Sequence, residues 1–107
     1  MYTLYKPIGY DCSVSNGCGS GRLGAVLVPD SLVGLCIKEA CNIHDYMYHV
    51  GVTIEDKKLA DRVFLNNMTR IVLLEGGPLL HPRLALVRKY YEVVKYFGGP
   101  AFWKGKQ

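Results

Sequence analysis

The sequence lacks any long apolar segment and any recognisable export signal. Its longest uninterrupted apolar runs, such as IVLL (71–74), are a few residues long, whereas a membrane-spanning helix needs about 20. The start, MYTLYKPIGYDC, has neither a basic segment nor an apolar core, so no signal peptide is visible. A complete chain of this kind is expected to begin in the cytoplasm or to leave by an unusual route. A secreted or virion-associated location stays open.

A strong charge bias, internal repeats and low-complexity segments are also missing. The net charge of +4 over 107 residues is a mild basic bias. It suits an anionic lipid surface or a phosphate-bearing ligand, but it is too weak to indicate nucleic acid. With 50% hydrophobic and 21% charged residues, the composition is that of a globular protein. A chain of this length is expected to form one domain, residues 1–107, around one modest core.

The cysteines include no C-x-x-C pair. The four are Cys12, Cys18, Cys36 and Cys41. Their spacing does not favour zinc, and zinc binding by these residues, with or without His44, is the least favoured interpretation. An even number in a small chain fits two disulfides, for which three pairings exist. A bridge between Cys12 and Cys36 and two buried free thiols are equally open.

What the sequence does contain is helical periodicity after a glycine-rich first third. Five glycines and two prolines within residues 1–29 predict irregular structure, with SNGCGSG (15–21) as the most flexible point. Apolar residues at helical spacing then predict a helix from Asp30 or Ser31 to about His49, ended by Gly51.

Two further helices are expected. Thr53 with an acid three residues later resembles a capping box, so a second helix should run from Thr53 to the glycines at 76–77. A third should start near Pro82 and end at residues 98–100, before a short amphipathic tail. We therefore expect a mainly α-helical fold. Two antiparallel helices carry the site, a third C-terminal helix follows, and a glycine-rich loop region precedes them.

One face of the first predicted helix gathers four side chains at positions i, i+3, i+4 and i+7. They are Cys41, His44, Asp45 and Tyr48. On the second helix Asp61 falls on the apolar stripe, and an inward carboxylate needs a partner. A short connection makes the two helices antiparallel neighbours, and counting from Gly51 brings His44 and Asp61 to within about one turn in height.

This geometry suggests two kinds of site. An imidazole held by a carboxylate through one nitrogen is a prepared general base, which assigns His44 and Asp61 to one pair. Asp45 then remains, and a carboxylate beside several backbone carbonyls is a calcium site by ligand type. Asp61 pairing with Lys57 instead, or facing solvent, stays open, as does simple core packing for Tyr48.

Three motifs in this order resemble the phospholipase A2 superfamily. ACNIHDYMY (40–48) fits its C-x-x-H-D-x-x-Y helix, closest to the short bacterial and fungal members. CGSG (18–21) resembles the C-G-x-G of its calcium loop. ADRVF (60–64) looks like the A-D-x-x-F of the lipase domain in parvovirus capsids. Together they span residues 17–64, a little under half of the chain, and residues 65–107 show no usable resemblance.

The resemblance implies calcium-dependent hydrolysis of the sn-2 ester of phospholipids at a membrane interface. His44 would take a proton from the attacking water, Asp61 would orient His44, and Tyr48 would hydrogen-bond Asp61. The resemblance also implies calcium ligands and a bridge. The ligands would be Asp45 and the carbonyls of Gly17, Gly19 and Gly21, and the bridge would join Cys18 to Cys41. The partner would be a phospholipid bilayer surface, and oligomeric state stays open.

Some positions depart from the family pattern. Ala40 and Met47 stand where the animal secreted enzymes carry further cysteines. Arg22 follows the C-G-x-G where another glycine is common, and the loop has no tyrosine. These changes leave the catalytic residues of the helices unaltered, but they affect the calcium-binding geometry expected of the loop. The alternative is therefore a catalytically inactive phospholipase A2-like module that binds membranes or proteins.

Overall fold

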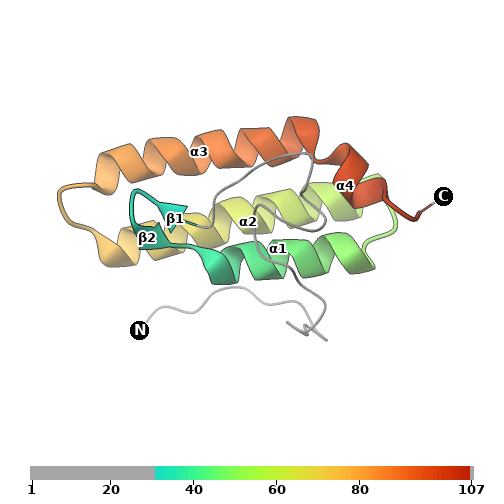
Figure 1. The fold of residues 1–107 in the computed structure, drawn as a ribbon, viewed down its shortest axis with the longest axis horizontal. Helices are drawn as coiled ribbons and strands as arrows, with labels where there is room; N and C mark the ends of the chain where they lie inside the picture. Colours follow the sequence, from blue (N-terminus) through green and yellow to red (C-terminus); the bar gives the residue numbers. More distant parts are fainter. Residues whose placement is uncertain (1–30, 107) are drawn as a thin grey trace.

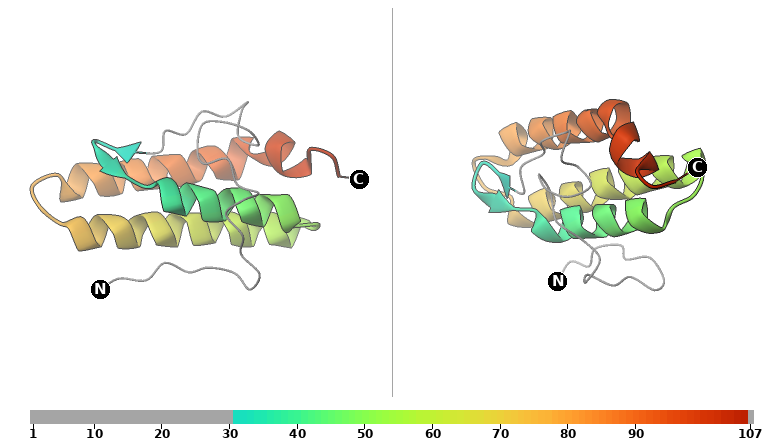
Figure 2. Two further views of the ribbon diagram at one scale, coloured as in Figure 1. Left: turned by 60° about the horizontal axis from the view of Figure 1, so that its bottom comes forward. Right: turned by 45° about the vertical axis from the view of Figure 1, so that its right-hand side comes forward.

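The computed structural model describes residues 31–106, and predictions that concern residues 1–30 lie outside it. The elements are β1 (Ser31–Leu32), β2 (Leu35–Cys36), α1 (Lys38–Val50), α2 (Ile54–Glu75), α3 (Leu80–Phe97) and α4 (Gly99–Trp103). Helices α1, α2 and α3 lie side by side, with α2 between the other two, and the short α4 bends from the end of α3 toward α1 (Figures 1 and 2). The predicted mainly α-helical fold is confirmed.

The first helix begins later than predicted. Ser31 pairs with Cys36 and Leu32 with Leu35 in an antiparallel hairpin, and α1 starts only at Lys38. The hairpin turn places residues 33 and 34 at φ values of 48° and 83°. Two successive left-handed residues cannot continue a right-handed helix, but they are the backbone of a tight hairpin turn. A start at Asp30 or Ser31 is therefore wrong.

A contact far along the chain holds this hairpin in place. The guanidinium of Arg83, in α3, donates to the carbonyl oxygens of Leu32 and Val33 at 2.9 and 2.8 Å. The Tyr90 hydroxyl donates to the Ser31 carbonyl at 3.0 Å. Because these partners lie 50 to 59 residues away in sequence, local helical spacing could not reveal them.

The remaining helix ends follow the local signals. Gly51 caps α1, and Thr53 caps α2 with the predicted capping box completed by Asp56. The Thr53 hydroxyl accepts from the Asp56 amide at 3.2 Å, and the Asp56 carboxylate accepts from the Thr53 amide at 3.0 Å. Gly76 ends α2. Only three residues, 51–53, separate α1 from α2, so the two helices are antiparallel neighbours, as the sequence predicts.

The core lies where the three long helices and α4 meet. Its fully buried larger side chains are Leu32, Ile37, Ile43, Tyr48, Phe64, Met68, Val72, Val94 and Phe102. Phe97, the last residue of α3, is 64% exposed, while Phe102 of α4 is buried. The chain turns at Gly98, and this turn brings Phe102 edge-on against Tyr48 with ring centroids 5.2 Å apart. Within residues 31–106, no helix has the length and apolar character needed to cross a bilayer.

Candidate active site

The predicted contact between His44 and Asp61 is present in the structure. His44 Nε2 lies 2.8 Å from Asp61 Oδ1 across the α1–α2 interface. The two residues are 0% and 2% exposed, so the pair is shielded from water. Asp61 carries no proton to give when ionised, so Nε2 donates and Nδ1 keeps its lone pair. This tautomer follows from the charge of the carboxylate, whose pKa is considered below.

The imidazole ring is fixed by aromatic neighbours. It stacks on Phe64 with ring centroids 4.6 Å apart, and its centroid lies 4.2 Å from that of the Tyr48 ring. The other nitrogen, Nδ1, is buried and has no hydrogen-bond partner within the part of the chain that the structure describes. A ring held through Nε2 with an open Nδ1 lone pair is arranged to accept a proton at Nδ1.

Asp61 is the centre of the hydrogen-bond network. Its Oδ1 accepts from His44 and from the Tyr48 hydroxyl, the latter at 2.7 Å, and its Oδ2 accepts from Lys57 Nζ at 2.8 Å. Burial alone would raise the pKa of Asp61. The hydrogen bond from His44 and the positive charge that this ring carries when protonated, followed by the hydrogen bonds of Lys57 and Tyr48, outweigh burial and lower that pKa below its usual value. The carboxylate therefore stays ionised at neutral pH.

Lys57 holds the far side of this carboxylate. Its side chain is nearly buried, and its ammonium also donates to the backbone carbonyls of Val94 and Lys95 at 3.1 and 3.3 Å. These carbonyls belong to the last turn of α3, where the helix dipole favours a cation, and the Val94 carbonyl also accepts from the Gly98 amide at 2.9 Å. Lys57 thus links the Asp61 carboxylate, which orients His44, to the end of α3.

The sequence treated Lys57 and His44 as alternative partners of Asp61, and the structure gives Asp61 both. The i,i+4 spacing of Lys57 and Asp61 is the local signal for this pair. No local pattern in the sequence predicts that Lys57 also contacts the carbonyls of Val94 and Lys95, because these carbonyls belong to another helix.

Tyr48 makes the hydrogen bond that the sequence proposed for it, and it also packs in the core. Burial raises the pKa of its hydroxyl, and the charge and hydrogen bond of Asp61 raise it further. The hydroxyl therefore stays protonated and acts as a donor. It lies against the end of α3, where a Cβ on Gly98 would stand only 2.5 Å from the hydroxyl oxygen. A residue without a side chain at position 98 allows this approach.

Asp45 is fully buried on α1 beside His44. Its carboxylate is a hard oxygen donor of the kind calcium prefers. Across residues 31–106 no three His, Cys, Asp or Glu side chains form a metal-binding group. The calcium site predicted from the sequence adds backbone carbonyl ligands to Asp45. The predicted ones, Gly17, Gly19 and Gly21, lie outside the described residues.

The cysteines of the described region differ from each other. Cys41 is fully buried and disulfide-bonded, whereas Cys36 is a free and exposed thiol. The predicted partner of Cys41, Cys18, lies outside the described residues, so that pairing stays a prediction. For Cys36 neither alternative holds, since it is neither bridged to Cys12 nor buried.

Comparisons with protein-family models, with curated proteins and with solved structures find no match to this chain.

Proposed function

We propose that this protein is a calcium-dependent phospholipase A2, which hydrolyses the sn-2 ester of phospholipids at a membrane interface. The observation that carries the proposal is the His44–Asp61 pair, with Nε2 held at 2.8 Å and Nδ1 left without a partner in the described region. Asp45, the neighbouring buried acid on the same helix, supports it. The His44–Asp61 pair is arranged for proton transfer, and the Asp45 carboxylate is a suitable ligand for a calcium ion.

In this proposal His44 acts as the general base. A water molecule gives its proton to Nδ1 as its oxygen attacks the sn-2 carbonyl carbon. The same proton then passes to the departing glycerol oxygen, so that the ester and water become a fatty acid and a lysophospholipid. Because Nδ1 is buried, the reaction needs a path by which a water molecule reaches this nitrogen.

Asp61 and its hydrogen-bond partners keep His44 in the tautomer and orientation that a general base needs. The carboxylate fixes the tautomer of His44 and stabilises the imidazolium that forms when Nδ1 takes the proton. Tyr48 and Lys57 hold both carboxylate oxygens in place, so that Asp61 cannot turn away from His44. Asp45 with the carbonyls of Gly17, Gly19 and Gly21 would hold calcium, which would supply positive charge to stabilise the developing oxyanion.

The test is release of fatty acid from phospholipid vesicles by the full chain with calcium present. We expect His44→Gln to leave the helical circular-dichroism spectrum intact and to abolish release, because glutamine cannot serve as the base. His81→Gln is the matched control, since His81 is exposed on α3, and it should keep wild-type activity. Removal of calcium by a chelator should also stop the reaction.

Two results would contradict the proposal. Fatty-acid release that is unchanged by His44→Gln, or unchanged by calcium removal, would exclude the proposed mechanism. Vesicle binding with no release by the wild-type protein, over a range of lipids, would select the inactive membrane-binding module instead.

A further inference from the structure

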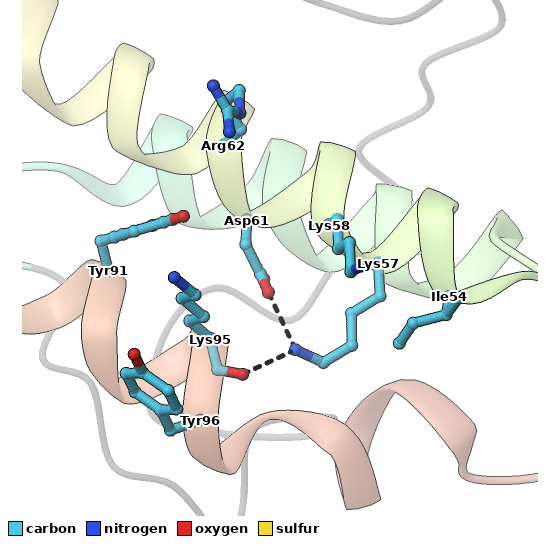
Figure 3. Close-up of a pocket in the computed structure, with 8 residues that line it drawn as sticks. All are labelled: Ile54, Lys57, Lys58, Asp61, Arg62, Tyr91, Lys95 and Tyr96. Atoms are coloured by element: carbon cyan, nitrogen blue, oxygen red, sulfur yellow. Dashed lines mark hydrogen bonds and ion pairs between the residues drawn. The ribbon is translucent and has the colours of Figure 1, made fainter.

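A second site lies on the other side of Asp61, between α2 and α3. A pocket of about 380 Å³ opens there, which we call the α2–α3 pocket. Its lining residues are Ile54, Lys57, Lys58, Asp61, Arg62, Tyr91, Lys95 and Tyr96 (Figure 3). Its volume falls within the range of small-molecule sites, roughly 300–1,000 Å³.

The lining is strongly cationic. Four of the eight lining residues are Lys or Arg, and Asp61 is the one acid among them. The charge of Asp61 is already balanced, because Lys57 Nζ lies 2.8 Å from its Oδ2. The Lys57 ammonium also donates hydrogen bonds to the carbonyls of Val94 and Lys95. This inner pair is neutral and leaves the charges of the other three cations uncompensated.

Those three cations are Lys58, Arg62 and Lys95. All are exposed, and none forms an ion pair with a carboxylate of residues 31–106. Lys58 and Arg62 stand one helical turn apart on α2, and Lys95 comes from α3 on the opposite side. The pocket therefore brings positive charge from two helices around one hollow, which an anion would neutralise.

Aromatic rings surround the Lys95 ammonium. It lies 5.8 Å from the ring centroid of Tyr91 and 5.3 Å from that of Tyr96, and Figure 3 shows the side chain directed from α3 toward α2. A smaller hollow next to the pocket shares these three residues and adds Leu65, Arg88 and Glu92 to the lining.

We propose that the α2–α3 pocket binds a phosphate group, carried either by a small organic molecule or by a lipid headgroup. Arg62 offers the planar, two-pronged donor geometry that suits phosphate oxygens, and the lysines add point charges. The tyrosine rings and Ile54 give apolar walls to the group that carries the phosphate. This site does not depend on hydrolysis at His44, since its three uncompensated cations, Lys58, Arg62 and Lys95, take no part in the proposed reaction.

The test measures phosphate binding by the full chain at fixed salt. Inorganic phosphate and glycerol 3-phosphate are titrated by calorimetry, and phosphatidylcholine vesicles with and without phosphatidic acid are tested by co-sedimentation. Arg62→Gln and Lys95→Gln should each weaken binding about tenfold, because each removes one charge-assisted hydrogen bond. Lys38→Gln is the matched control: it removes the same charge from an exposed residue of α1 that does not line the pocket.

The two probes separate the two sources of phosphate. Saturable binding of the soluble phosphates indicates a small-molecule ligand, and binding only to phosphatidic acid vesicles indicates a headgroup. Either result supports the site if Arg62→Gln and Lys95→Gln weaken it and Lys38→Gln does not. If all three variants weaken phosphate binding equally, the binding reflects only the net charge of the protein, and the proposal is overturned. Absence of binding to every probe would also overturn it. Circular dichroism checks that the variants, all at exposed positions, remain folded.

Discussion

Lys57 Nζ and Asp61 Oδ2 lie 2.8 Å apart, on the side of the carboxylate opposite the oxygen that holds His44. One buried acid therefore accepts hydrogen bonds from three side chains, His44, Tyr48 and Lys57, and each of its oxygens is occupied. The lysine also reaches carbonyls of α3, so the orientation of the proposed general base depends on the packing of all three long helices.

Replacing Lys57 by methionine should destabilise the protein strongly. The change keeps the apolar stem but leaves Asp61 without its Oδ2 partner in a buried place, and breaking a buried pair in this way costs about 3–5 kcal/mol. Urea unfolding measures the loss. Lys58→Met, at the adjacent exposed position, should change the free energy of unfolding by no more than about 0.5 kcal/mol. Similar effects of the two changes would mean that the Lys57 pair contributes little.

Replacing Asp61 by asparagine should reduce kcat for phospholipid hydrolysis by about 10⁴-fold, since the amide can hold the wrong tautomer and does not stabilise an imidazolium. Substrate binding should change little because Asp61 faces His44 rather than the lipid. Steady-state kinetics on vesicles separate kcat from KM. A loss confined to KM would show that Asp61 does not orient a general base.

Adding a methyl group at Gly98 should force Tyr48 and the end of α3 apart. The new Cβ would lie 2.5 Å from both the Tyr48 hydroxyl and the Val94 carbonyl oxygen, and overpacking of this kind costs about 1–3 kcal/mol. Thermal unfolding of Gly98→Ala measures it. The control is Gly99→Ala, where the same Cβ meets nothing within 4 Å. A wild-type melting temperature for Gly98→Ala would contradict the predicted contact.

Acid should weaken the fold through Asp61. Its pKa is lowered in the folded protein, so its contribution to stability is complete above the unfolded value of about 3.9. This contribution is lost as the pH falls through the lower folded-state value. Urea midpoints between about pH 2 and 6 should therefore fall more steeply with acid for wild type than for Asp61→Asn.

The exposed Glu55 on the first turn of α2 provides the control for this experiment. Glu55→Gln should keep the steep acid dependence of the wild-type protein. Parallel pH curves for wild type and Asp61→Asn would show that the buried carboxylate is not the group responsible.

The sequence alone determined the features that depend on neighbours along the chain. Gly51 and Gly76 end helices, and Thr53 begins one with a capping box, because capping uses atoms within a few residues of each other. The facing of His44 and Asp61 was also predictable, since two helices joined by three residues leave little freedom in height.

Only the tertiary structure decided the contacts between distant parts of the chain. The hairpin at residues 31–36 replaces the predicted first helical turns because its carbonyls are bound by Arg83 of α3. Lys57 reaches Asp61 and two carbonyls of α3 at once. Helical periodicity shows which face of a helix is apolar, but the partner of each polar group on that face depends on how the helices pack.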